Sequence, residues 1–154
     1  MSIFSFFKKP KPEPVTTAAP IAALNEWGVL FQTRSLFIYN RYAGTLPNDE
    51  GDIVYMKTYP EVPFLNNKLF TNWYFLGFNG IFLQQLSDAN ATTRSLIFVS
   101  FETFEGAIVK TNITAKSWEA RVINGYEIEF MFNGATTDVY RLKQNEISFN
   151  NPLI

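Results

Sequence analysis

Three Asn-Gly dipeptides constrain the fold of this chain more than any other feature of its sequence. They lie at Asn79-Gly80, Asn124-Gly125 and Asn133-Gly134. Asn-Gly is typical of two-residue type I′ hairpin turns, because both central positions of that turn require a positive φ. We therefore expect each dipeptide to join two antiparallel strands that are neighbours in the sequence.

Alternating side chains flank the second and third dipeptides. Over residues 126–132 every even-numbered position is apolar, while Glu127 and Glu129 fall between them. A period of two is characteristic of a strand with one buried face. Residues 118–123 and 139–143 continue the same series before and after this segment. The expected core residues are Phe98, Trp118, Val122, Tyr126, Ile128, Phe130, Phe132, Tyr140 and Leu142.

Further strands are expected at residues 29–39, 53–59, 96–104 and 107–114, which are rich in β-branched and aromatic residues. Pro60 and Pro63 should end the second of these segments, and Glu105-Gly106 should join the last two. A total of about eight to ten short strands is typical of an antiparallel barrel or sandwich. The predicted fold class is therefore all-β, with a meander in the C-terminal half.

The first twenty residues differ from the rest of the chain. Residues 3–7 contain Phe4, Phe6 and Phe7, and residues 8–20 contain three lysines and four of the eight prolines. Proline fixes φ and lacks a donor, so residues 8–20 cannot form a helix or a central strand. We expect a flexible, extended tail over residues 1–20 and a single β domain over residues 21–154. The tail either tethers an aromatic anchor to a partner or has no specific role.

Both faces of the hairpin around Asn79-Gly80 are apolar, because aromatic and aliphatic residues occupy odd and even positions alike. A strand of this kind must be covered on both sides. One cover is the core of the domain, and the other is a second sheet, a bound apolar ligand or another subunit. The residues that we predict to contact a partner protein are Phe4, Phe6, Phe7, Trp73, Tyr74, Phe75 and Phe78.

The sequence contains no cysteine and no histidine. The commonest general base and the commonest metal ligand are therefore missing, as are thiolate chemistry and disulfides. The acidic segment 48–52 lacks the ligand spacing of a calcium loop. Glu127 and Glu129 are expected to be solubilising charges on the outward face of a strand. We predict that the protein is not an enzyme and needs no cofactor or metal.

The charge balance bears on possible partners. From residue 21 onward the chain has ten basic and thirteen acidic residues, which argues against a general nucleic-acid surface even though Arg34, Arg41 and Lys57 lie near tyrosines. The longest uncharged run, residues 69–87, contains polar residues and a turn, so it predicts a hairpin and not a membrane span. No secretory signal peptide is recognisable at the N-terminus. We expect the protein in a virion or in the cytoplasm, with neither nucleic acid nor membrane as its partner.

These features together favour a non-catalytic structural or adaptor subunit of a larger assembly, such as a virion capsid or a phage-like particle, that contacts other protein subunits. A β-barrel that binds an apolar small molecule is the first alternative, because aromatic residues make up 17% of the chain. A bacterial inhibitor or immunity-type binding protein and an enzyme that uses carboxylate, tyrosine or lysine chemistry are the others.

Overall fold

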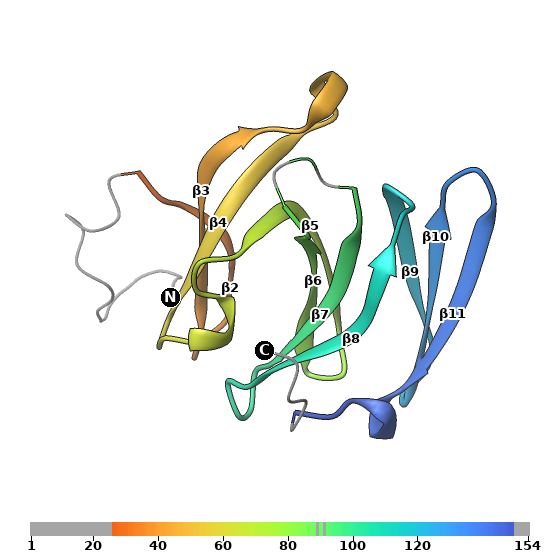
Figure 1. Ribbon diagram of the computed structural model, residues 1–154. Helices are drawn as coiled ribbons and strands as arrows, with labels where there is room; N and C mark the ends of the chain where they lie inside the picture. Colours follow the sequence, from red (N-terminus) through yellow and green to blue (C-terminus); the bar gives the residue numbers. More distant parts are fainter. Residues whose placement is uncertain (1–25, 89, 91, 150–154) are drawn as a thin grey trace.

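The chain forms two antiparallel β-sheets, as the ribbon in Figure 1 shows. The computed structural model describes residues 26–88, 90 and 92–149. The predicted tail, with Phe4, Phe6 and Phe7, lies outside the described residues. The all-β fold class predicted from the sequence is confirmed.

The larger sheet has seven strands and the smaller has three, and no α-helix occurs among the described residues. The seven-stranded sheet contains β2 (Gly28–Gln32), β3 (Phe37–Thr45), β4 (Asp52–Tyr59), β5 (Leu69–Gly77), β6 (Gly80–Leu86), β7 (Arg94–Ser100) and β8 (Gly106–Ile113), in that order. The three-stranded sheet contains β9 (Ser117–Asn124), β10 (Glu127–Asn133) and β11 (Thr137–Lys143). Short 3₁₀ turns occur at η2 (Pro47–Asp49), η3 (Pro63–Leu65) and η4 (Gln144–Glu146).

The strands form three layers, because the seven-stranded sheet bends between β4 and β5, where only Val54 and Phe70 are paired. Strands β2–β4 pack against one face of β5–β8, and the three-stranded sheet packs against the other face (Figure 1). The first core, between β2–β4 and β5–β8, contains Leu36, Ile38, Val54, Met56, Val62, Leu65, Phe70, Ile81, Leu83, Ile97 and Val99. The second core, against the three-stranded sheet, contains Phe82, Leu96, Phe98, Ile113, Ala115, Trp118, Ile128, Phe130, Phe132 and Leu142.

Strands β6 and β7 are buried on both faces. On β6, Ile81 and Leu83 contribute to the first core, and Phe82 between them contributes to the second. All three side chains are fully buried. The β6 strand of the two-faced apolar hairpin is therefore covered on both sides by this chain itself, whereas Tyr74 and Leu76 on β5 are 39% and 41% exposed.

The turn between β5 and β6 lies one residue earlier than its Asn-Gly dipeptide suggests. Phe78 and Asn79 both have a φ of 54°, so they are the two central turn residues, and Gly80 already belongs to β6. A methyl group at Gly80 would clash with the ring of Phe98 and the carbonyl oxygen of Val99. This glycine is thus required by the close approach of β7 and not by the turn conformation.

Two of the nine predicted core residues are exposed, so that part of the prediction is wrong. Val122 is 56% exposed and Tyr126 is 62% exposed. A register shift between Glu127 and Ile128 puts Tyr126 into the turn and not into β10. Val122 lies on the edge strand β9, opposite the fully buried Ile128, so at this position the second core covers β10 but not β9.

The single strand expected at residues 29–39 is also wrong, because a turn divides it into β2 and β3. The hydroxyl oxygen of Thr33 accepts a hydrogen bond from the backbone N–H of Leu36 at 3.0 Å. The N–H of Thr33 donates to the carbonyl oxygen of Leu36 at 2.8 Å. A threonine that bonds the backbone locally competes with strand pairing, which ends β2 here.

Candidate functional site

The four hairpin residues predicted to contact a partner lie on two different faces of β5 and its turn. Trp73, Phe75 and Phe78 are partly buried and pack against the second core. Tyr74 is on the other face, 39% exposed, with its ring centroid 5.6 Å from that of Phe31. A partner contact by these residues stays a prediction, and Tyr74 is the most accessible of the four.

Exposed apolar side chains gather at the turn between β9 and β10. We call Val122, Ile123 and Tyr126 the hairpin-tip patch; their exposed fractions are 56%, 37% and 62%. Val122 and Ile123 are successive residues of β9, so the patch extends over both faces of the hairpin tip. The backbone N–H of Gln144 donates to the carbonyl oxygen of Tyr126 at 2.9 Å, which holds the turn against η4. A hollow of about 470 Å³ lies beside Tyr126 and is lined also by residues 143–145. Strand β9 is an edge of its sheet, so this patch adjoins unpaired backbone groups.

Glu129 is not the solvated surface charge that the sequence predicts. Its side chain is only 7% exposed, because Arg121 and Arg141 from the two neighbouring strands lie across it. Each guanidinium places a nitrogen 3.3 Å from the same carboxylate oxygen. Both arginines are more than half exposed. The two ion pairs therefore form a network on the outer face of the three-stranded sheet, with the Glu129 carboxylate at its centre.

The basic and aromatic residues near the N-terminal strands form a cation–π cluster. The guanidinium of Arg41 lies 5.3 Å from the ring centroid of Trp27 and 5.2 Å from that of Tyr55. The ammonium of Lys57 lies 4.7 Å from the Trp27 centroid. Arg41 also pairs with Glu26 at 3.0 Å. These cations are therefore already engaged by aromatic rings of this chain and, for Arg41, by a carboxylate.

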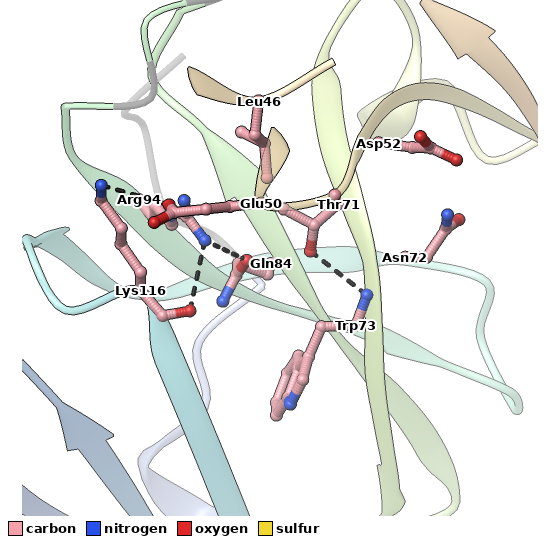
Figure 2. Close-up of a pocket in the computed structure, with 10 residues that line it drawn as sticks. Leu46, Glu50, Asp52, Thr71, Asn72, Trp73, Gln84, Arg94 and Lys116 are labelled. Atoms are coloured by element: carbon pink, nitrogen blue, oxygen red, sulfur yellow. Dashed lines mark hydrogen bonds and ion pairs between the residues drawn. The ribbon is translucent and has the colours of Figure 1, made fainter. Parts of the chain in front are cut away.

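A hollow of about 450 Å³ lies at the opposite end of β9 from the hairpin-tip patch, and Figure 2 shows it in detail. Several separate parts of the chain contribute to it: the loop around η2, the first half of β5, strands β6 and β7, and the connection that precedes β9. Its lining residues are Leu46, Glu50, Gly51, Asp52, Thr71, Asn72, Trp73, Gln84, Arg94 and Lys116. We call it the charged hollow, because four of these side chains are ionisable as carboxylate or cation.

Arg94 is the deepest charge in the charged hollow, with 4% of its surface exposed. Its Nη1 donates to the side-chain oxygen of Gln84 at 2.8 Å and to the carbonyl oxygen of Lys116 at 3.3 Å. Its Nε is buried without a hydrogen-bond partner. Burial lowers the pKa of Arg94, and the nearby carboxylate of Glu50 raises it in part. The arginine therefore links β6, β7 and the segment before β9. Its positive charge is hydrogen-bonded only to neutral oxygen atoms.

An ion pair forms the rim of the charged hollow. The ammonium nitrogen of Lys116 lies 3.3 Å from a carboxylate oxygen of Glu50, and the two side chains are 52% and 44% exposed. Figure 2 shows Lys116, Glu50 and Arg94 pointing toward one another, with Asp52 and Asn72 on the other side of Thr71. The arrangement can hold an anion at its two cations, but it presents no nucleophile activated by an adjacent base.

The sequence did not predict this hollow, because residues 48–52 were considered only as a possible calcium loop and Arg94 was not singled out. One available signal was the position of Arg94 two residues before the apolar run at residues 96–99. Arginine is seldom buried without a reason. The contributing segments become neighbours only when the layers pack, which the sequence pattern does not reveal.

Other classes of site can be assessed within the part of the chain that the structure describes. No group of three or more acidic residues there is arranged to hold a metal ion. Within the same ranges, no helix has the length and apolar character required to cross a membrane. Comparison of the chain with known protein families, with curated proteins and with solved structures found no match.

Proposed function

We propose that this protein is a non-catalytic structural or adaptor subunit of a larger protein assembly, such as a virion or a phage-like particle. The observation that carries the proposal is the hairpin-tip patch: Val122 and Ile123 on the edge strand β9 and Tyr126 in the turn after it, each more than a third exposed. Apolar surface grouped in this way is typical of protein–protein contact sites. An unpaired strand edge beside it offers backbone groups to a second chain.

The interior of the molecule favours a packed subunit over a carrier of an apolar ligand. The Phe82 and Phe130 rings are fully buried with centroids 5.0 Å apart, and Trp118 and Phe132 are in the same edge-on contact at 5.0 Å. Side chains of this chain therefore fill the space between the middle layer and the three-stranded sheet. The hairpin-tip patch, in contrast, has no cover among the described residues.

The proposal gives two surfaces to test. The first is the hairpin-tip patch, and the second is the aromatic anchor Phe4, Phe6 and Phe7 predicted from the sequence. A tail that docks on a neighbouring copy and an apolar patch on an edge strand are complementary means of joining subunits. A virion or cytoplasmic location follows from the same proposal.

The test is the solution mass of the full chain, measured by light scattering over a wide concentration range. We expect an oligomer that dissociates on dilution, and we expect Val122→Thr with Tyr126→Ser to weaken it. A triple replacement of Phe4, Phe6 and Phe7 by serine tests the anchor separately. Val139→Thr is the matched control, because Val139 is equally exposed at 57% but lies on β11, near the turn at the other end of β10.

A strict monomer at every concentration would contradict self-assembly. It would favour the alternative functions, which are a carrier of an apolar small molecule or a binding protein for a different partner. An oligomer that is unaffected by both sets of substitutions would keep the assembly function but exclude these surfaces as its contacts.

A further inference from the structure

Arg94 is a buried cation that no carboxylate among the described residues pairs with. Its two acceptors, the amide oxygen of Gln84 and the carbonyl oxygen of Lys116, are both neutral. Both of them bind Nη1, while Nε has no partner and Nη2 has none within the described part of the chain. Buried charges in proteins are ordinarily paired, because removing an ion from water is expensive.

The charged hollow gives a ligand access to this unpaired charge. Its volume of about 450 Å³ is within the range of pockets that hold small molecules. Arg94 and Lys116 both line it, so two cations reach the same space from different segments. Thr71 adds a hydroxyl to the lining, a group that orients a polar ligand.

We propose that the charged hollow binds a small carboxylate-bearing molecule, with its carboxylate between the guanidinium of Arg94 and the ammonium of Lys116. This site is separate from the hairpin-tip patch, since it lies at the far end of β9 from it. Guanidinium groups bind carboxylates through charge-assisted hydrogen bonds, which are stronger than those to neutral acceptors.

Glu50 determines which anions fit. Its carboxylate lies in the same hollow, already paired with Lys116, and it also acts on Arg94 electrostatically. A ligand carboxylate must therefore replace Glu50 at Lys116. The Lys116–Glu50 pair is about half exposed on both sides, so opening it costs little. A phosphate dianion is repelled more strongly by Glu50 than a monocarboxylate is, but it is also attracted more strongly by Arg94 and Lys116, so phosphate is the competing ligand in the test.

The experiment is a titration of the full chain with sodium propionate, at ionic strength held constant with sodium chloride, followed by NMR. We expect saturable shifts at the Arg94 Nε–H and at the backbone amides of Glu50 and Lys116. Glu50→Gln removes the competing charge, so it should tighten propionate binding by about two- to fivefold. Lys116→Met should weaken propionate binding by a similar factor. Glu119→Gln, an exposed acid outside the hollow, is the matched control and should change nothing.

These variants keep Arg94 in place, because replacing it breaks its contacts to Gln84 and Lys116 and endangers folding itself. A purely structural role for Arg94 does not account for tighter binding in Glu50→Gln. The proposal is overturned if propionate causes no saturable shift at Arg94 in both the unmodified chain and Glu50→Gln. It is overturned as well if Glu50→Gln and Glu119→Gln respond alike, or if sodium phosphate binds more tightly than propionate.

Discussion

The indole nitrogen of Trp73 donates a hydrogen bond to the carbonyl oxygen of Trp118 over 3.1 Å, although the two residues are 45 positions apart in the chain. Their rings also meet edge to face, with centroids 5.3 Å apart. Trp73 belongs to β5 in the middle layer, and Trp118 belongs to β9 in the three-stranded sheet. This pair therefore joins the two sheets, which share no backbone ladder.

Replacing Trp73 by phenylalanine should destabilise the fold by about 1–3 kcal/mol. The substitution keeps an aromatic ring but removes the donor to Trp118, and it leaves a gap beside the second core. Urea unfolding followed by circular dichroism measures the change. Tyr74→Phe is the control on the adjacent, more exposed position, and it should stay within about 0.5 kcal/mol. Equal unfolding midpoints for the two variants would mean that the contact contributes nothing.

Gly80→Ala should also destabilise the protein, by about 1–3 kcal/mol, because the added methyl group meets the Phe98 ring and the Val99 carbonyl oxygen. The free energy of unfolding from a urea titration gives the value. Gly125→Ala is the matched control, since Gly125 does not have the positive φ that its Asn-Gly dipeptide suggests and no atom lies within 4 Å of a methyl group placed there. If both substitutions were neutral, the close approach of β6 and β7 described above would be wrong.

Phe130 and Val122 were both expected in the core, but only Phe130 is buried in the structure. Phe130→Ala should cost about 3–5 kcal/mol, because the ring is fully buried in the second core. Val122→Ala should change the free energy of unfolding by less than about 0.5 kcal/mol, because Val122 is 56% exposed. The comparison is made on monomeric protein at low concentration, so that self-association does not protect Val122. A large loss at Val122 would restore the original core assignment.

Alkaline pH should destabilise the fold through two tyrosines. Burial raises the pKa of Tyr39, and the charge of Tyr59 adds to the effect. Burial likewise raises the pKa of Tyr140, with Glu146 adding to it. Below the ordinary value of 10.0 both phenols are neutral in the folded and unfolded states, so their contribution to stability is fully present. Above pH 10.0 the unfolded chain loses these protons first, and stability falls until the folded-state pKa values are passed.

Urea titrations between neutral pH and pH 11 test this expectation, with about 10 as the reference pKa of a free tyrosine. Tyr39→Phe and Tyr140→Phe should each reduce the alkaline loss of stability. Lys68 acts in the opposite direction, because burial lowers its pKa, so the slopes of the variants are compared with that of the unmodified chain. An unchanged slope in both variants would contradict the assignment.

Most of the fold could be predicted from the periodicity of the sequence. The alternation around Phe130 predicted β9, β10 and β11 and most of the second core, because side-chain direction along a strand has a fixed period of two. The strand at residues 53–59 and the hairpin at Glu105-Gly106 were also close to β4 and to the turn between β7 and β8. Local chemistry was sufficient for these elements.

The sequence-based predictions were wrong where contacts with residues distant in the sequence determine whether a side chain is buried. The register shift beside Glu127 moved Tyr126 into solvent, and the limited extent of the second core exposed Val122. Glu129 became buried because two arginines from adjacent strands lie across it. The charged hollow needs the packing of separate segments around Arg94, so no run of residues predicts it. The alternation around Asn79-Gly80 did predict two covers, but only the layered structure shows that both covers of β6 belong to this chain and that Tyr74 and Leu76 on β5 stay exposed.

The double-sided burial of β6 and β7 has a consequence for amide hydrogen exchange. Their backbone N–H groups are enclosed by the first core on one side and the second core on the other, so separation of either outer layer leaves one face covered. Amides of Phe82 and Phe98, which face each other across the pair, should exchange only when the whole domain unfolds. Amides of β9 and β11, at the free edges of the small sheet, should exchange through much smaller openings, so isotope labelling would reveal the order in which the layers separate.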